Sequence, residues 1–202
     1  MPAGGGPEER AAAPEPPEAA SHSRIPTDWS RNGHMLYNDI GPDGTGIWAL
    51  SLAAPRRVFP VIVSSTFGVR DGQFSPDGMW MAFQSSESGR SEVYVQPFPG
   101  PGPKVQISST GGAQVRWRGD GHELFYVALD GKLMSVVLGP SSKADVVNVA
   151  APVALFTTHI RGAIQPMDRA QYVVSPDGQR FLMNNIVDES FPAISVILNW
   201  RP

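Results

Sequence analysis

The sequence predicts an all-β fold, and three observations lead to this class. A turn motif recurs along the chain, a short apolar run follows each copy, and the 202 residues include 21 Gly and 20 Pro. Together these two residue types usually make up only about 12% of a protein, so the excess favours a fold with many turns. Helical spacing of apolar residues is weak and confined to Lys143–Phe156.

The turn motif predicts the architecture because its first three copies recur at a nearly constant spacing. It occurs as WSRNG (Trp29–Gly33), FSPDG (Phe74–Gly78), WRGDG (Trp117–Gly121) and VSPDG (Val174–Gly178). The closing glycines are separated by 45, 43 and 57 residues, and the first two spacings match the period of a four-stranded propeller blade. The longer third spacing predicts an insertion between Lys143 and Asp168. The sequence therefore predicts β-propeller blades of four antiparallel strands, about three and a half to four in number, in an incomplete ring.

The turn residues themselves are predicted to be structural. Asp or Asn can bond the nearby backbone, and Gly adopts the positive φ that closes such a turn. The predicted structural residues are Asn32, Gly33, Asp77, Gly78, Asp120, Gly121, Asp177 and Gly178. Turn chemistry explains the repeated Asp–Gly pairs better than calcium binding does.

The strands are predicted on either side of each turn. A large apolar residue precedes the turn, the runs MLY, MAF, LFY and FLM follow it, and glycine-containing hairpins lead to IWAL, VYV and LMSVV. Trp29, Phe74 and Trp117 share one place in the repeat, with Val174 in the fourth copy. We expect the three aromatic residues to pack between neighbouring blades, and an aromatic binding platform is the alternative.

Composition excludes several classes of function. The chain has no Cys, so a disulfide scaffold and thiolate chemistry are excluded. A net charge of −3 argues against nucleic acid as a partner, although Arg116, Arg118 and Arg161 could form a small basic rim. Apolar runs such as Val58–Val63 are too short to span a bilayer. We therefore expect neither nucleic-acid binding nor membrane insertion by this chain.

No catalytic, cofactor-binding or metal-binding residue is predicted. The chain lacks the G-x-S-x-G motif of a nucleophile elbow. Asp39 and Asp43 lie close together in NDIGPDGTG, but the ligand spacing of a calcium loop is missing. The histidines, which show no paired metal-ligand spacing, are His22, His34, His122 and His159. A solvent-facing hairpin position is the expectation for His34 and His122.

The repeats resemble the TolB-type β-propeller family, whose blades read S-P-D-G, apolar strand, glycine-containing hairpin and a VYV-like strand. From Pro26 to Trp200 the chain is more similar still to the propellers in the C-terminal half of bacterial serine/threonine protein kinases. That resemblance implies a sensor or interaction module on the extracytoplasmic side of a membrane kinase. The chain has no G-x-G-x-x-G-x-V, V-A-I-K, H-R-D or D-F-G motif, so it resembles a C-terminal fragment of such a kinase.

The predicted organisation has two parts. Residues 1–25 are rich in Pro, Ala, Gly and Glu, which predicts a disordered tail, and GGGPEER is also similar to the last strand of a preceding blade. Residues 26–202 form the blades. An incomplete ring would leave apolar faces at both ends and favour self-association.

The leading functional hypothesis is a non-catalytic binding or sensor module for a protein or a small ligand. An accessory domain that gates a hydrolase and a structural fragment without retained function remain alternatives. By analogy with other propellers, a ligand would bind at the mouth of the central channel. The loops expected there are Thr66–Asp71, Ser109–Gln114 and Arg161–Asp168.

Overall fold

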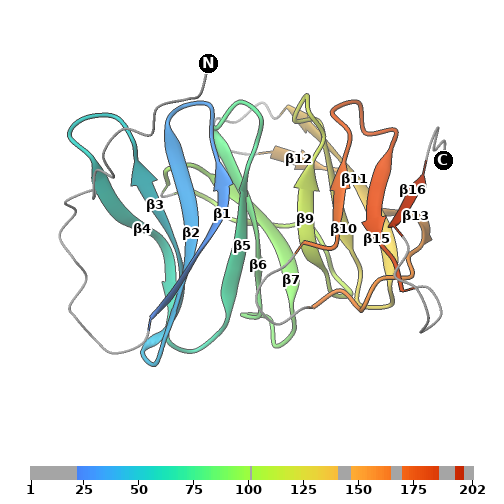
Figure 1. The fold of residues 1–202 in the computed structure, drawn as a ribbon, viewed down its shortest axis with the longest axis horizontal. Helices are drawn as coiled ribbons and strands as arrows, with labels where there is room; N and C mark the ends of the chain where they lie inside the picture. The colour runs from blue at the N-terminus through green and yellow to red at the C-terminus, as the bar shows by residue number, and fades with distance from the viewer. Residues whose placement is uncertain (1–21, 101, 141–146, 165–169, 187–193, 198–202) are drawn as a thin grey trace, which may run out of the picture.

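The chain is all-β in the computed structural model, which describes residues 22–100, 102–140, 147–164, 170–186 and 194–197. In these described segments, sixteen strands form four antiparallel sheets that stand side by side in chain order (Figure 1). Within the described segments there is no helix that could cross a membrane. The sheets are the blades that the repeat predicted.

The first two sheets have four strands each, and in both the strand order follows the chain. The first contains β1 (Ser23–Trp29), β2 (His34–Gly41), β3 (Gly44–Ser51) and β4 (Arg57–Ser64). The second contains β5 (Val69–Phe74), β6 (Trp80–Ser85), β7 (Glu92–Pro97) and β8 (Val105–Gln106). Strand β1 begins inside the segment predicted as a tail, and residues 1–21 lie outside the described part of the chain.

The third sheet has five strands instead of the predicted four. It contains β9 (Ala113–Trp117), β10 (Glu123–Val127), β11 (Lys132–Pro140), β12 (Val147–Val149) and β13 (Val153–Thr157). The long strand β11 pairs with β12 near its end and with β13 near its start. Part of the insertion predicted after Lys143 therefore extends this sheet. The fourth sheet contains β14 (Tyr172–Val174), β15 (Phe181–Asn184) and β16 (Ile194–Ile197).

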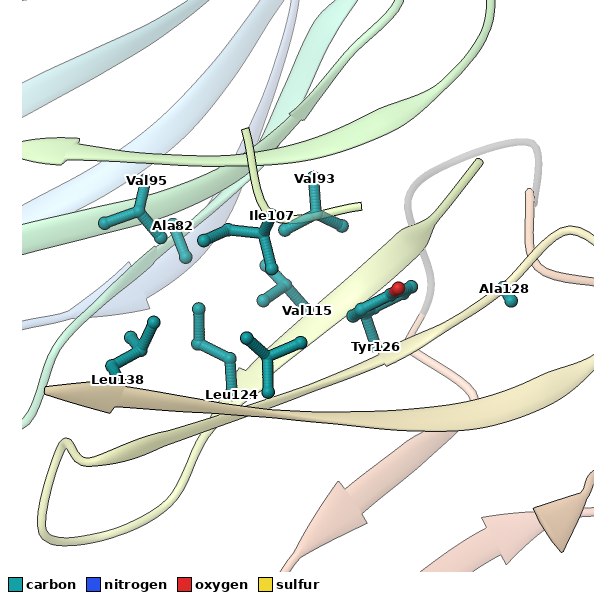
Figure 2. Close-up of a cluster of buried hydrophobic side chains, with 10 residues drawn as sticks. Ala82, Val93, Val95, Ile107, Val115, Leu124, Tyr126, Ala128 and Leu138 are labelled. Carbon is teal, nitrogen blue, oxygen red and sulfur yellow. The ribbon is translucent and has the colours of Figure 1, made fainter. Parts of the chain in front are cut away.

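Three hydrophobic clusters hold neighbouring sheets together, because each inner sheet is covered on both faces. In β7, Val93 and Val95 face the third sheet while Tyr94 packs in the cluster shared with the first sheet. Figure 2 shows the cluster between the second and third sheets, which brings Val93 and Val95 over Leu124. Period-2 alternation thus places apolar side chains on both faces of one strand.

The sheets form an arc that does not close into a ring in the described part of the chain. Figure 1 shows the first and last sheets at opposite ends of the molecule. Their outward faces carry exposed apolar side chains, among them Trp29 on β1 and Val173 and Leu182 on the last sheet. On the first sheet, Trp29 begins a cross-strand row that continues through Met35 and Leu50.

Trp29 corrects one expectation about packing between blades. At the same place in the repeat, Phe74 is buried against the first sheet, and Trp117 packs on the cluster between the second and third sheets. Trp117 also donates its indole N–H to the carbonyl of Gln73 at 3.2 Å. Trp29 is instead 64% exposed. The residue at this place packs on the preceding sheet, and no described sheet precedes Trp29.

Candidate functional site

The repeat turns lie at one end of the sheets, where their polar groups are bonded within each turn. Gly33, Gly78, Gly121 and Gly178 have φ values of +76°, +71°, +77° and +72°. Asp77 Oδ1 accepts hydrogen bonds from Ser75 Oγ at 2.5 Å and from the Met79 N–H at 3.0 Å. Asp177 repeats this arrangement with Ser175 and Gln179. Only short local contacts are needed to build these turns.

Neighbouring turns also bond each other across the gap between blades. Asn32 Nδ2 donates to the Asp77 carbonyl at 2.8 Å, and the Gly119 N–H donates to the Pro176 carbonyl at 2.9 Å. In the third turn Arg118 binds both carboxylate oxygens of Asp120, at 2.8 and 2.7 Å. This guanidinium is the main reason why the pKa of Asp120 falls to about 2. The polar groups named here at the turn end therefore already have hydrogen-bond or ion-pair partners within the protein.

The remaining acidic and histidine candidates have structural surroundings. His34 is half-buried instead of fully solvent-facing as expected, and its ring packs edge-on against Phe98, with centroids 5.3 Å apart. Asp39 is buried and accepts from His22 Nδ1 at 2.5 Å. Asp43 is exposed, and the described residues contain no group of three His, Asp or Glu side chains placed to hold a metal ion.

The opposite end of the sheets, which we call the mouth, contains a different kind of backbone. Asp71 and Gln114 occupy the same place in consecutive blades, and both have a positive φ, +57° and +56°, although neither is Gly. Gln114 joins the last two blades: its Nε2 donates to the Ala163 carbonyl at 2.6 Å, and its Oε1 accepts from the Gln171 N–H at 2.8 Å. Such left-handed residues cost free energy and persist only where their surroundings impose them.

A row of polar side chains follows the innermost strands behind the mouth. Asp71, Arg116 and Tyr172 come from β5, β9 and β14. Arg116 Nη1 lies 3.9 Å from Asp71 Oδ2, and its guanidinium carbon lies 5.9 Å from the centroid of the Tyr172 ring. The Tyr172 hydroxyl is buried without a hydrogen-bond partner, and burial raises the pKa of Tyr172. Of the three arginines considered for a basic rim, Arg116 thus lies half-buried on an innermost strand.

The predicted loop Ser109–Gln114 is held by a fully buried carboxylate. Both oxygens of Glu92 accept from the Gly111 N–H, at 3.0 and 2.9 Å, and Ser108 donates its hydroxyl to the same carboxylate. Arg90 Nε donates to Glu92 from the surface at 2.7 Å. Because a buried charge needs several partners, Glu92 fixes the conformation of this loop.

A cleft of about 170 Å³ opens at the mouth. Its walls are formed by Gly68, Arg70, Gln84, Ser85, Ser86, Ser91 and Ile164. Two of the three loops expected at the mouth supply residues to it, Gly68 and Arg70 from the first and Ile164 from the third. Residues 165–168 of the third loop lie outside the described part of the chain. The loop Ser109–Gln114 contributes no wall residue, although the Ser91 hydroxyl donates to the Gly112 carbonyl at 3.1 Å.

Gln84 is the feature of this cleft that sequence reasoning missed. It follows the buried run MAF near the end of β6 and is 7% exposed, yet its Oε1 has no hydrogen-bond partner. Its cross-strand neighbour is Arg70. A polar residue at a position that continues the alternation of Ala82, whose side chain packs toward the third sheet, was the available signal.

A second hollow, of about 270 Å³, lies at the turn end between the second and third blades. Trp80, Trp117, Asp77, Asp120 and His122 are among the residues that line it. The carboxylate of Asp120 already accepts two hydrogen bonds from Arg118. Trp117 packs against the hydrophobic cluster between the second and third sheets. The mouth cleft is therefore the better candidate for a binding site.

Comparison with known proteins assigns the fold. The described architecture superposes on TolB from Acinetobacter baumannii with a TM-score of 0.63 and 18% identity, covering 88% of this chain and 41% of that protein. A protein described as TolB from Agrobacterium tumefaciens gives 0.60 and 21% identity, covering 87% of this chain and 57% of that one. The chain has a TolB-like β-propeller fold.

The same fold occurs in part of a peptidase. A puromycin-hydrolyzing peptidase from Mycobacterium tuberculosis matches with a TM-score of 0.62 and 16% identity, covering 90% of this chain and 28% of that protein. No family model and no curated protein sequence matches the chain. The chain spans 41% and 57% of the two TolB structures, and these likenesses describe the fold alone.

Proposed function

We propose that the chain is a non-catalytic β-propeller module that binds a small ligand or a protein segment at its mouth. The observation that carries this proposal is the mouth cleft, which is lined in part by the buried Gln84, whose Oε1 has no hydrogen-bond partner. Nearly all buried polar groups in folded proteins have partners, so one that lacks them in a surface cleft is a candidate contact for a ligand.

The lack of catalytic signatures supports a binding role. The sequence contains neither a phosphate-cradling loop nor a nucleophile elbow. We therefore expect purified protein to show neither ATP turnover nor ester hydrolysis. Robust turnover that a point substitution within the chain abolishes would overturn the non-catalytic part of the proposal.

The module is proposed to come from the C-terminal half of a bacterial serine/threonine protein kinase, on its extracytoplasmic side. The sequence resemblance over Pro26–Trp200 supports this origin. The neighbouring coding sequence tests it: kinase motifs and a membrane span upstream are the expected result. A pull-down with the full-length parent protein, compared with a parent whose mouth is blocked by Gly68→Val, would identify the ligand or partner.

A propeller that gates a hydrolase is the second candidate. The likeness to the puromycin-hydrolyzing peptidase favours it, since there the matched part covers 28% of a larger enzyme. In that case a G-x-S-x-G motif would be encoded in the same reading frame outside this chain. Finding that motif in place of the kinase motifs would replace the kinase origin with this one.

The exposed end faces bear on the third alternative, a structural fragment. Trp29, Val173 and Leu182 are 64%, 53% and 43% exposed on the first and last sheets. Because exposed apolar sheet faces favour association, we expect the isolated chain to form dimers or larger species. Light scattering that shows a monodisperse, thermostable monomer would contradict this expectation.

A further inference from the structure

The mouth cleft has a size and a donor set that narrow the class of ligand, and this inference rests on the proposed function. A volume of about 170 Å³ is several times the ~30 Å³ that one water occupies in the liquid. It is well below the 300–1,000 Å³ of pockets for drug-sized ligands. The cleft therefore suits a molecule of a few carbon atoms.

One wall of the cleft offers hydrogen-bond donors. Arg70 is the charged residue among those that line it, and a guanidinium has five N–H donors, so it can serve more than one partner. Arg70 Nη2 and Ser86 Oγ lie 3.8 and 3.5 Å from the place that a Cβ would take at Gly68, so the two groups converge on the same space. The Ser86 hydroxyl accepts from the Gly68 N–H at 2.9 Å and keeps its own hydrogen to donate.

The same face of the second sheet also offers an acceptor. Gln84 is paired with Arg70 across β5 and β6, so both side chains lie on the same face of the second sheet. Its amide oxygen has no partner, and a ligand hydroxyl or ammonium would supply one. The positively charged guanidinium of Arg70 and the unpartnered Oε1 of Gln84 therefore lie on two neighbouring strands.

We propose that this cleft binds a small carboxylate that carries a hydroxyl or amino group on the adjacent carbon. The carboxylate binds Arg70 and the Ser86 hydroxyl, because a guanidinium matches a carboxylate in geometry and charge. The adjacent hydroxyl or ammonium donates to Gln84 Oε1. A 2-hydroxy acid and a 2-amino acid share this chemistry, and the experiment distinguishes them.

Amide chemical shifts of Gly68, Ser91 and Ile164 in the full chain measure binding. The probes are glycerate and serine, with propionate and glycerol as matched compounds that lack the donor and the carboxylate, respectively. We expect glycerate, serine or both to shift these amides saturably, with a Kd on the order of 1 mM or tighter. Propionate and glycerol should bind at least about tenfold more weakly, the equivalent of one hydrogen bond to a group otherwise left unpaired.

Three variants assign the contacts. Gln84→Met keeps the side-chain volume without the amide and should weaken binding by at least about tenfold, as should Arg70→Met. Gly68→Val fills the cleft and should abolish binding. Gln179→Met makes the same change at an exposed position of the turn end and should bind like the unaltered chain. Equal binding by Gln84→Met, or equal binding of propionate, would overturn the proposal.

A wider set of small polar fragments separates this inference from the proposed function. If other fragments shift the same amides while glycerate and serine do not, the ligand class is wrong and a binding mouth remains. If none shifts them, both the ligand class and the binding mouth are wrong.

Discussion

The two ends of the sheets are built in opposite ways. At the turn end, glycine occupies each positive-φ position, and the side chains of Asp77, Asp120 and Asp177 accept hydrogen bonds within their own turns. At the mouth, positive φ falls on the non-glycine residues Asp71 and Gln114 as well as on glycines such as Gly111, and the buried Oε1 of Gln84 has no hydrogen-bond partner.

The difference bears on the proposed function. The turn end meets every local requirement of its backbone, which is what a purely structural element needs. The mouth accepts left-handed non-glycine residues and the unpartnered Oε1 of Gln84. In folded proteins, costs of this kind are often concentrated at functional sites. Replacing the unpartnered amide of Gln84 should therefore change the free energy of unfolding in the opposite direction from replacing a glycine of the turn end.

The largest effect is expected at the turn end, from Gly78→Val. The residue has φ +71°, and a Cβ would lie 2.5 Å from Asn32 Nδ2, the atom that bonds the Asp77 carbonyl. The strain costs about 1–3 kcal/mol of unfolding free energy, and the lost bond between blades adds about 1 kcal/mol.

Gly33→Val is the matched control, because Gly33 has φ +76° with nothing within 4 Å. Gly33→Val should lower the unfolding free energy through backbone strain alone, without the loss of a hydrogen bond between blades. Asp43→Ala, on an exposed hairpin, should leave the unfolding free energy nearly unchanged. Urea unfolding measures all three variants. Equal losses for Gly78→Val and Asp43→Ala would mean that the repeat turns are wrongly assigned.

Gln114→Ala is expected to destabilise by about 1–3 kcal/mol, because it leaves the Gln171 N–H and the Ala163 carbonyl unpaired between two blades. Gln114→Gly should be better tolerated, since glycine adopts the φ of +56° without strain. Gln179→Ala, at an exposed position of the turn end, is the control. Unfolding followed by tyrosine and tryptophan fluorescence gives the order, and a Gly variant less stable than the Ala variant would show that φ stores no strain here.

The turn end could be predicted from sequence because its chemistry is local. Each turn needs residues within five positions of one another, so SPDG and its variants fix it wherever they occur. The contact between Gln114 and Gln171, in contrast, joins residues 57 positions apart. The third sheet gained β12 because the insertion after Lys143 pairs with an elongated β11, and nothing in the repeat indicates that pairing.

Trp29 and Gln84 both show that the repeat does not predict the surroundings of a residue. Trp29 shares a place in the repeat with Phe74, but its burial depends on a neighbouring sheet and not on its own strand. Gln84 continues the alternation of β6, but whether its amide finds a partner depends on the loops that surround it. Repetition predicts the place of a residue within a blade, and the neighbouring blade decides its surroundings.

Gln84→Met is expected to stabilise the protein, in contrast to Gly78→Val and Gln114→Ala. Removing a buried oxygen that has no partner should raise the unfolding free energy by about 1 kcal/mol, since its desolvation is no longer uncompensated. Gln179→Met at the exposed turn end should change stability by less than about 0.5 kcal/mol. Thermal unfolding measures both variants. A loss of stability in Gln84→Met would show that the amide is satisfied in the folded chain and would remove the contrast between the two ends.

The smallest effect concerns pH at the third turn. Arg118 lowers the pKa of Asp120 to about 2, below the ~3.9 of an unfolded chain. A carboxyl whose pKa is depressed on folding stabilises the folded state above its unfolded pKa, and this stabilisation is lost as the pH falls through the folded pKa. Because the pair is largely exposed, its contribution should stay below about 1 kcal/mol. The stability difference between the unaltered chain and Asp120→Asn should therefore be constant above pH ~5 and shrink between pH ~4 and ~2. Urea unfolding across this range measures it, and a difference that grows on acidification would show that Arg118 does not hold Asp120 in solution.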